Sequence, residues 1–504
     1  MPAAWEAQQL GPFIGGINTR SDPSGIDDTE LADCVNLELD LNGSLIVRPP
    51  IQSMNGPTST SRIRVIGFGI ISTSYYLIVA NDTTVWSFNG VSFTQIVTGI
   101  KAARALQYKS LVYIIPFSDS LVTGGSWNGS TYTNIPAMPK GSDAIIFKER
   151  MWIPSGTTSG RLFFSDIADP GAWPASNFFD VSPGDGQSLW KVAIFNNNLL
   201  IFKSDGTFVL SYDTKPADAT LERISNTIGV TDYRCFAQNQ NNIFIYHEGY
   251  VYQLVNYEFV QINQRVVFEY DGFSPSTRGD NIFLSFVGDR LLVRFFNRIY
   301  VYNTLTQTWT RWEAVDAEIN NFSGFFEFPS DSSVTVDRVY YAGSSLLSSN
   351  KVFIIRNVHT DLQNEATLIN CKIKTKDYTF DAPWKFKRLF AWGADVLTKR
   401  DVTAIATPIT FGFTPTWENL SVYMWDQLNT WAMPTTASLQ ISTSVTGGNG
   451  TLKRFYKFNK SLRFRQINFQ VHIETDGTVS EGPNRFYTLT LFMRVKETVS
   501  KQVS

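Results

Sequence analysis

The side chains that most often do chemistry in proteins are few in this chain of 504 residues, and they lie far apart. The three histidines are His247, His359 and His472. The three cysteines are Cys34, Cys235 and Cys371. Neither set has the spacing that a metal site or a histidine-based catalytic triad requires. An odd number of scattered cysteines argues against a disulfide framework and favours folding in a reducing cytoplasm.

Carboxylates could form the acid and base pair that glycoside hydrolysis needs, but no pair stands out. The acids of the central region are scattered through predicted turns, namely Asp205, Asp213, Glu248, Asp280 and Asp289. The segment Ser165–Trp173 loosely resembles a sialidase Asp-box, which we interpret as a turn between strands. No glycine-rich loop carries a lysine that could bind phosphate, and 447–450 is interpreted as a hairpin tip. We expect no catalytic residue, no metal ligand and no cofactor.

Charge is balanced over the whole chain and uneven along it. There are 43 lysines and arginines against 45 aspartates and glutamates, so the net charge is −2 and gives no general attraction to nucleic acid or membrane. Residues 1–62 are acidic, whereas 372–400 and 453–465 are basic. Two interpretations of the basic runs stay open: a solvated strand face, or a contact with an acidic partner, the acidic segment 1–62 or DNA phosphates. The residues predicted as assembly contacts are Asp27, Asp28, Glu30, Asp33, Lys385, Lys387, Arg388, Lys453, Arg454, Lys457, Arg463 and Arg465.

Short strands separated by polar turns must position these residues. Aromatic residues make up 14% of the chain and charged residues only 17%, which favours half-buried strands and an all-β fold. Between Ile63 and Asn357 the same hairpin pattern recurs. Its clearest copies are Ile145–Asp166, Ile194–Asp213, Cys235–Tyr257 and Ser285–Asn303. Equivalent points of seven copies are Trp86, Trp127, Phe163, Val209, Val251, Tyr300 and Phe353.

The spacing of these copies brackets the period of roughly 40–50 residues that is typical of propeller blades. A single small sheet cannot bury its own apolar faces, so the copies must stack around an axis. We therefore predict one β-propeller of about seven blades over residues 63–357, with six or eight as alternatives. A β-sandwich with fortuitous spacing is the remaining alternative.

The flanking segments are predicted to form a separate platform. In the arm, 1–62, acids precede 29–34, which predicts a short helical turn, and 35–39 with 44–47 predict a hairpin. After residue 358, alternating segments predict an antiparallel sandwich over 358–504. The segment Trp417–Trp431 is left undecided between a helix and a loop. The first ten residues have no secretory signal pattern, and no apolar stretch is long enough to span a bilayer. Because the first and last blades of a propeller are adjacent, the arm and the sandwich can meet, with the propeller inserted between them.

One resemblance comes from the arm. The elements Gly15-Gly16-Ile17-Asn18, Asp28-x-Glu30-Leu31 and Asn36-x-x-x-Asp40-x-x-Gly43-x-Leu45-x-x-Arg48-Pro49 resemble the opening of many tail proteins of tailed bacteriophages. The pattern Tyr378-x-Phe380…Pro383 resembles the part of such tail proteins that follows their propeller. With a propeller and a sandwich behind it, this opening is similar to that of tail nozzle (tubular tail) proteins.

This resemblance implies a structural role without catalysis. Nozzle proteins assemble as homohexameric rings below the portal and adaptor, bind other tail proteins, and form the conduit of the virion tail. Viral DNA passes through the lumen without sequence-specific binding, is retained there, and is released on infection. The resemblance also implies assembly in the bacterial host cytoplasm and no membrane insertion. The alternatives are a minor or distal tail protein of a long-tailed phage, and a propeller that binds or hydrolyses host-surface carbohydrate.

The scattered carboxylates lead to a first prediction. The purified chain is expected to leave bacterial surface polysaccharides intact, because no acid and base pair is placed across a sugar bond. Reducing-end release from a polysaccharide panel measures this. Depolymerisation that a single Asp→Asn or Glu→Gln substitution abolishes would contradict it.

Overall fold

The protein is all-β and contains a β-propeller. The computed structural model describes residues 6–58, 61–155, 160–240, 242–268, 282–296, 298–313, 322–328, 339–344, 350–356, 369–380, 387–397, 402–409, 441–445, 452–464, 466–473 and 485–495. Its contacts divide the chain into two compact units. Unit 1 comprises Met1–Pro50, Asn303–Glu313 and His359–Ser504, and unit 2 comprises Ile51–Tyr302 and Ala314–Val358. We expected the arm to extend to residue 62, but residues from Ile51 on belong to unit 2.

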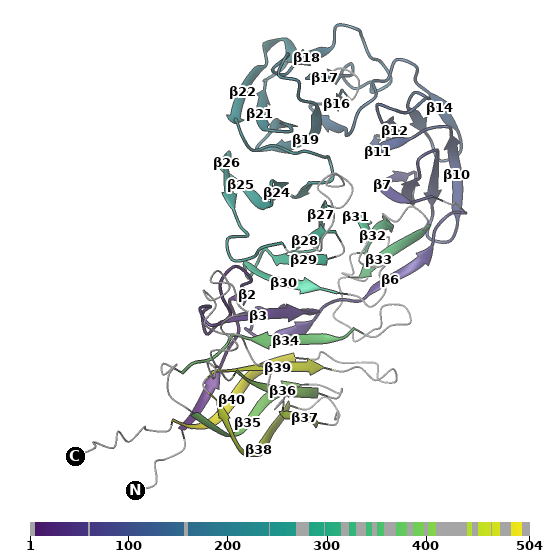
Figure 1. Ribbon diagram of the computed structural model, residues 1–504. Helices are drawn as coiled ribbons and strands as arrows, with labels where there is room; N and C mark the ends of the chain where they lie inside the picture. The colour runs from purple at the N-terminus through teal and green to yellow at the C-terminus, as the bar shows by residue number, and fades with distance from the viewer. Residues whose placement is uncertain are drawn as a thin grey trace, which may run out of the picture. The chain divides into compact units, whose positions relative to one another are not determined.

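Unit 2 is the propeller, in which four-stranded antiparallel sheets are arranged around a centre (Figure 1). The first sheet contains β7 (Arg64–Ile71), β8 (Ser74–Ala80), β9 (Thr84–Phe88) and β10 (Phe93–Thr98). The second contains β11 (Ala102–Tyr108), β12 (Leu111–Pro116), β13 (Gly125–Trp127) and β14 (Tyr132–Asn134). The third contains β15 (Ile145–Phe147), β16 (Arg150–Pro154), β17 (Arg161–Phe164) and β18 (Phe178–Asp180). The fourth contains β19 (Leu189–Phe195), β20 (Asn198–Lys203), β21 (Gly206–Ser211) and β22 (Thr220–Ser225). The fifth contains β23 (Phe236–Asn239), β24 (Asn242–His247), β25 (Tyr250–Val255) and β26 (Glu258–Gln261).

The sixth sheet joins strands from the two ends of unit 2. It contains β31 (Phe322–Phe328), β32 (Val339–Ser344), β33 (Lys351–Arg356) and β6 (Ile51–Asn55) in that order. The ladder pairs Ile51 with Ile355 and Asn55 with Lys351, although about 300 residues separate them along the chain. The strand that begins unit 2 therefore completes its last sheet and closes the propeller.

The predicted count of seven blades is wrong, because the described residues form six four-stranded sheets. The copy at Ser285–Asn303 accounts for the difference. It contributes three strands to unit 2, β27 (Ile282–Val287), β28 (Arg290–Phe295) and β29 (Arg298–Asn303). The next strand, β30 (Thr308–Trp312), belongs to unit 1, where it pairs in parallel with β3 (Glu30–Val35). A hairpin repeat reveals the strands of a copy but not the sheet that its last strand joins.

Polar turns set the hairpins, as the sequence predicts. Tight turns of the type that suits the twist of antiparallel strands need positive φ at both central residues. Such pairs occur at Lys148 (φ 48) and Glu149 (φ 59), Asn196 (φ 46) and Asn197 (φ 60), and Glu248 (φ 47) and Gly249 (φ 92). Between the turns, alternate apolar side chains pack from sheet to sheet. One such cluster spans the third and fourth sheets and contains Trp152, Phe164, Leu199, Phe208 and Tyr212.

Unit 1 is built from both ends of the chain. One sheet has the order β38-β35-β40-β5-β4, with β1 beside β40. Its strands are β1 (Glu6–Leu10), β4 (Leu37–Leu39), β5 (Leu45–Val47), β35 (Lys387–Leu397), β38 (Leu452–Phe464) and β40 (Arg485–Val495). The other strands run β30-β3-β34-β39-β36-β37, with β2 beside β3. They are β2 (Gly16–Ile17), β34 (Cys371–Thr375), β36 (Val402–Ile409), β37 (Ile441–Val445) and β39 (Gln466–Ile473), in addition to β3 and β30.

Two predictions for the arm have different outcomes. The hairpin is confirmed, because β4 and β5 pair antiparallel across the turn at Leu41–Gly43. The helical turn at 29–34 is wrong, because Glu30–Val35 forms β3, which pairs with both β34 and β30. Strand partners on both sides outweigh a weak local capping signal. The segments 417–431 and 447–450 lie outside the described residues. No helix in the described part of the chain is long and apolar enough to cross a membrane.

The closing ladder gives a second prediction. Ile51 is 1% exposed, whereas its neighbour Gln52 is half-buried. Ile51→Ala should lower the free energy of unfolding by about 2–5 kcal/mol, because it leaves a cavity in the sheet that closes unit 2. Gln52→Ala on the same strand is the control and should change it by less than about 0.5 kcal/mol. Urea unfolding followed by tryptophan fluorescence measures both. Equal effects would mean that the β6 ladder does not hold the propeller closed.

Candidate functional site

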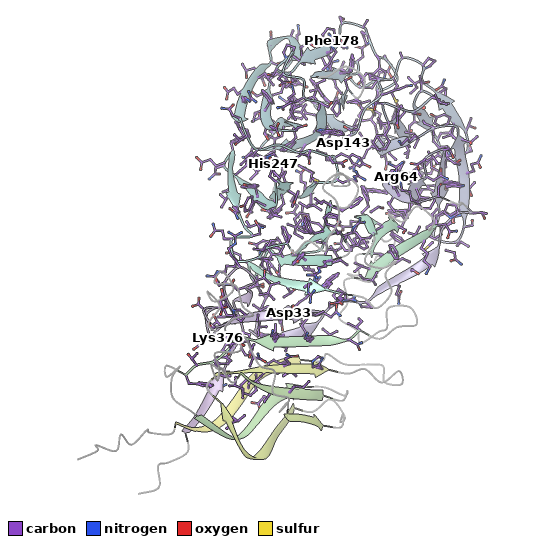
Figure 2. All side chains as sticks on the ribbon, viewed as in Figure 1. Asp33, Arg64, Asp143, Phe178, His247 and Lys376 are labelled. Atoms are coloured by element: carbon purple, nitrogen blue, oxygen red, sulfur yellow. The ribbon has the colours of Figure 1, made fainter. Side chains whose placement is uncertain are left out.

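The four acids predicted as assembly contacts are placed by β3 and the loop before it. Asp28 forms an ion pair with Lys376, with 2.6 Å between Oδ1 and Nζ, and Asp33 pairs with Arg311 at 3.0 Å. Glu30 is buried and accepts hydrogen bonds from Asn18 Nδ2 (2.8 Å) and the backbone N–H of Asp27 (3.1 Å). Asp27 itself is exposed. Figure 2 labels Asp33 and Lys376 within unit 1. Three of the four acids therefore have partners inside unit 1.

The predicted basic contacts gather on two neighbouring strands. Lys387 and Arg388 lie on β35, and Lys453, Arg454, Lys457 and Arg463 lie on β38. These strands pair antiparallel, which sets Arg388 opposite Arg463 and Arg454 opposite Asp395. Lys385 and Arg465 lie outside the described residues. Among the described residues, β38 is at one end of the order β38-β35-β40-β5-β4. The ion pairs that the arm's acids make use Lys376 and Arg311, two residues that the sequence did not single out as contacts.

Asn36 is the centre of the motif network in unit 1. Its Oδ1 accepts hydrogen bonds from Arg48 Nε and from the backbone N–H of Glu313, both at 2.8 Å, and its Nδ2 donates to the Asn370 carbonyl at 2.6 Å. Its backbone N–H donates to the Arg311 carbonyl at 2.8 Å. The residue is 2% exposed and has φ 60, a left-handed conformation that asparagine tolerates better than most residues. One side chain thus ties the arm to segments about 280 and 330 residues away.

Arg48, the last motif residue before the prolines, is fully buried beside Asn36. Its guanidinium stacks on the Trp312 ring at 5.4 Å, and Nη1 donates to the Pro49 carbonyl at 2.9 Å. Burial lowers the pKa of Arg48 to about 10, so the side chain remains charged at neutral pH. A buried charge with these partners is expensive to disturb, so Arg48 is expected to be intolerant of substitution in this fold.

The paired glycines of the motif allow close backbone approach. Gly16 has φ 70, and a Cβ there would lie 2.7 Å from the Trp309 carbonyl oxygen. A Cβ on Gly15 would lie 2.7 Å from Glu30 Cγ. β2 can pair with β3 in this position only because neither residue carries a side chain. Gly15, Gly16, Asn18, Glu30, Asn36 and Arg48 therefore act together as a structural unit.

The buried cysteines have the character of core residues. Cys34, Cys235 and Cys371 are all reduced and buried. Burial raises the pKa of Cys34 well above its ordinary value and that of Cys235 to about 12. A thiol that stays protonated is a poor nucleophile. The described residues contain no group of three or more His, Cys, Asp or Glu that could hold a metal ion.

Two candidates for chemistry from the sequence, His247 and Ser165–Trp173, lie within unit 2. His247 is 5% exposed, at the end of β24. The segment Ser165–Trp173 is a turn, as predicted. Within it the Asp166 N–H donates to the Ala172 carbonyl, the Gly171 N–H donates to Asp169 Oδ1, and Trp173 Nε1 donates to the Pro170 carbonyl. These bonds hold the segment in its turn conformation.

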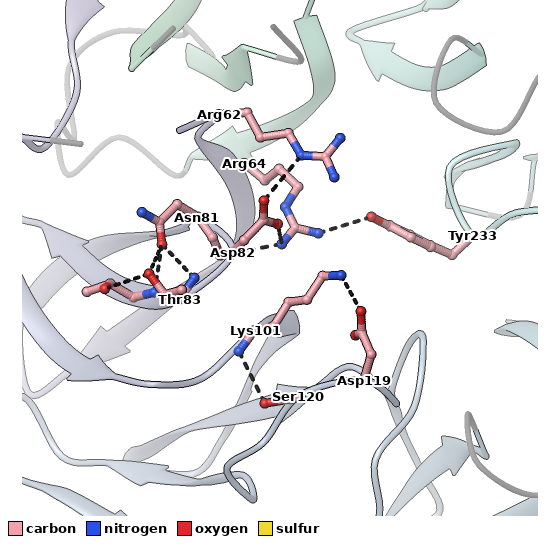
Figure 3. Close-up of polar contacts among 10 residues, drawn as sticks. Arg62, Arg64, Asn81, Asp82, Thr83, Lys101, Asp119, Ser120 and Tyr233 are labelled. Atoms are coloured by element: carbon pink, nitrogen blue, oxygen red, sulfur yellow. Dashed lines mark hydrogen bonds and ion pairs between the residues drawn. The ribbon is translucent and has the colours of Figure 1, made fainter. Parts of the chain in front are cut away.

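A group of paired charges lies within unit 2 (Figure 3). Arg62 and Arg64 both approach Asp82, with N···O distances of 3.9 and 3.6 Å, and Arg64 Nη1 donates to the Tyr233 hydroxyl at 3.5 Å. Lys101 pairs with Asp119 at 2.5 Å. Arg64 and Lys101 both lie over the Phe117 ring, at 5.1 and 5.7 Å.

A second charged cluster lies towards the centre of the propeller, where Figure 2 labels Asp143 and Arg64. Asp143 is 2% exposed. Lys191 on β19 approaches Asp143 Oδ2 to 3.0 Å, and Arg104 on β11 approaches Oδ1 to 3.8 Å. Burial lowers the pKa of Lys191, Asp143 opposes this shift, and Arg104 adds to it. No pattern in the sequence marks this cluster, because its members come from different parts of the propeller.

Similarity to known proteins is found in solved structures with low sequence identity and TM-scores below 0.5. No protein-family model and no curated protein matches the chain. One similar solved structure is the extracellular domain of a hybrid two-component system from B. thetaiotaomicron, with 13% identity over 61% of this chain, 40% of that chain and a TM-score of 0.45. The chain thus spans 40% of that domain's length. Virginiamycin B lyase from Staphylococcus aureus shares 10% identity over 61% of this chain and 99% of that chain, with a TM-score of 0.39. The Pan2 WD40 domain from Neurospora crassa shares 8% identity over 61% and 94%, with a TM-score of 0.34.

Substitutions of Asn36 give a third prediction. Asn36→Ala removes three side-chain hydrogen bonds and leaves buried partners unsatisfied, each at about 1–3 kcal/mol. It also places alanine at φ 60, which costs about 1–2 kcal/mol. Asn36→Gly loses the same bonds without that conformational cost and should be the milder change by about 1 kcal/mol. Urea unfolding measures the difference. If Asn36→Ala were as stable as the wild type, the network would not hold unit 1 together.

Proposed function

We propose that this chain is a structural protein of a bacteriophage tail, a ring-forming nozzle that continues the DNA channel and performs no chemistry on a substrate. The observation that carries the proposal is the buried network around Asn36 and Arg48. It contains two residues of the arm elements by which the chain resembles nozzle proteins, and it joins them to Glu313, Asn370 and Cys371. Two motif residues that are 12 positions apart and share a buried hydrogen bond are less open to chance than separate strings.

The chain order also supports a platform with an inserted propeller. Unit 1 takes its strands from 6–47, 308–312 and 371–495, and unit 2 occupies most of the sequence between them. We propose that unit 1 is the platform that contacts neighbouring subunits, the portal or adaptor and other tail proteins. The propeller would form the distal wall of the tail. In this proposal a change of subunit arrangement opens the channel, and DNA passes through the lumen without sequence-specific contacts.

Strand β38 is the proposed contact surface of the platform. It is 13 residues long, it is at one end of its sheet among the described residues, and it carries Lys453, Arg454, Lys457, Lys460 and Arg463. A charged edge strand discourages random pairing and can select an acidic partner. Because three of the arm's four predicted acids already have partners in unit 1, exposed Asp27 or acids of another protein would supply the opposite charge.

The oligomeric state of the purified chain tests the proposal. Native mass spectrometry and negative-stain microscopy should show closed rings, with six copies expected from the resemblance. A monomer or trimer that binds host-surface glycans would contradict the nozzle and favour the alternative of a carbohydrate-binding attachment protein. A ring that fails to bind portal or adaptor but binds tail-tube proteins would favour a distal tail protein.

Charge reversal on β38 is the fourth prediction. Lys453→Glu, Lys457→Glu and Arg463→Glu together should reduce ring formation at least about tenfold, because complementary charge sets association rate and register. Arg454 is kept, since it lies opposite Asp395 within the sheet. The control reverses three exposed residues of unit 2, Lys109, Lys215 and Arg223. It makes the same change in net charge and should leave the rings intact. If both triple variants assemble like the wild type, β38 is a solvated face.

A further inference from the structure

A cavity of about 500 Å³ lies at the centre of unit 2. Residues of β7, β11, β15, β19, β23, β27 and β31 line it, so each of the six four-stranded sheets contributes. Its volume is within the range of about 300–1,000 Å³ that is usual for small-molecule sites. Aromatic rings, among them Phe236, Phe283 and Phe326, share the lining with charged side chains. The proposed role in a tail makes no use of this cavity.

The basic side chains that line the cavity outnumber the acidic ones: Arg64, Arg104, Lys191 and Arg234 against Asp143 and Glu327. Asp143 is shared by two cations, Lys191 at 3.0 Å and Arg104 at 3.8 Å. Two other lining arginines have different acidic partners: Arg234 pairs with Asp232 at 2.6 Å, and Arg64 approaches Asp82 at 3.6 Å, which Arg62 also approaches at 3.9 Å. The cluster around Asp143 therefore carries a surplus positive charge. An anion placed beside Arg104 and Lys191 would neutralise it.

Arg104 has the character of a ligand-binding side chain. Its guanidinium lies over the Phe326 ring at 5.2 Å, and the separation of 3.8 Å between Nε and Asp143 is too long for a hydrogen bond. Its Nε atom is buried and has no hydrogen-bond partner among the described residues, and an arginine has five N–H donors in a fixed planar array. The side chain is 31% exposed, so a ligand in the cavity can reach it. Such an array matches the oxygen atoms of carboxylate and phosphate groups.

A buried hydroxyl group supplies an independent sign of a missing partner. Ser285 on β27 lines the cavity, is 6% exposed, and its Oγ has no hydrogen-bond partner in the described part of the chain. The Oγ atom of Ser323 on β31, which also lines the cavity, is likewise buried without a partner there. Buried polar groups are nearly always hydrogen-bonded, so each such group needs an explanation. An oxygen atom of a bound anion would accept from these hydroxyl groups.

We propose that the central cavity binds a small organic oxyanion, with its phosphate or carboxylate group held by Arg104 and Lys191. Ser285 donates a hydrogen bond to the same group, and the Phe236 and Phe326 rings contact the apolar part of the ligand. Asp143 does not contact the anion and competes with it for the two cations, which it approaches at 3.0 and 3.8 Å. This site does not depend on the proposed role in a tail.

Isothermal titration calorimetry of the full chain at low ionic strength tests the site, with inorganic phosphate and citrate as separate probes. At least one probe should bind saturably, with one molecule per chain. Arg104→Gln should weaken that binding at least about tenfold, the loss expected for a charged hydrogen bond. Tighter binding of phosphate assigns the ligand to phosphate esters, and tighter binding of citrate assigns it to polycarboxylates.

The matched control is Arg161→Gln. The Arg161 side chain is also 31% exposed, lies over a phenylalanine ring (Phe178, 3.8 Å) and neighbours an aspartate, but it does not line the cavity. It should leave binding within about twofold of the wild type, because no contact with the anion is lost.

Asp143→Asn should strengthen binding by removing the competing negative charge. If that variant fails to fold, Arg104→Gln decides alone, because the Arg104 Nε atom makes no hydrogen bond to a described residue. The proposal is overturned if neither probe binds saturably, or if Arg104→Gln binds like the wild type.

Discussion

The ladder between β6 and β33 is the constraint on which the rest of the chain depends. A four-stranded blade leaves apolar faces exposed unless blades stack on both of its sides, so a propeller is stable only when its ends meet. Here the meeting is made by backbone hydrogen bonds between strands from opposite ends of unit 2, with Ile51 opposite Ile355. The chain therefore begins and ends unit 2 on neighbouring strands of one ladder. The segment before residue 51 and the segment after residue 358 can consequently build one common unit.

Unit 1 depends on polar contacts of unusually long sequence separation. β1 pairs with β40, the last strand described, and Asn36 binds Glu313 and Asn370 with the same side chain. Hydrogen bonds of this kind add little net stability when both partners are solvated in the unfolded state, but losing one partner in a dry core is costly. These hydrogen bonds therefore act mainly by specifying one arrangement of the three segments that build unit 1: the arm, residues 303–313 and the residues after 358. The same argument explains a buried Arg48 and the glycines that let β2 lie against β30 and β3.

Local patterns in the sequence are enough to predict the hairpins but not the sheets that the hairpins join. Turns such as Asn196-Asn197 carry their geometry in two residues, so the strands on both sides of them are predictable. The sixth sheet needs β6, which is separated from its partners by nearly the whole propeller, and β30 leaves its repeat copy for unit 1. The same limit applies to the contacts. The sequence predicts that Asp28 and Asp33 make charged contacts. It does not predict that their partners are Lys376 and Arg311, which only the folded structure shows.

The central cavity shows the limit most clearly, because no local pattern marks Arg104, Asp143 and Lys191. Their residue types are ordinary and they lie far apart along the chain, so only closure of the propeller brings them together. A core built for stability alone would fill this space with aliphatic side chains, since burying charge costs more than most ion pairs return. A propeller that keeps charged groups at its centre therefore retains them against their energetic cost. The proposed structural role in a tail needs the stacked blades but not the charged groups at the centre of the propeller. The blades and the central charges therefore require separate explanations.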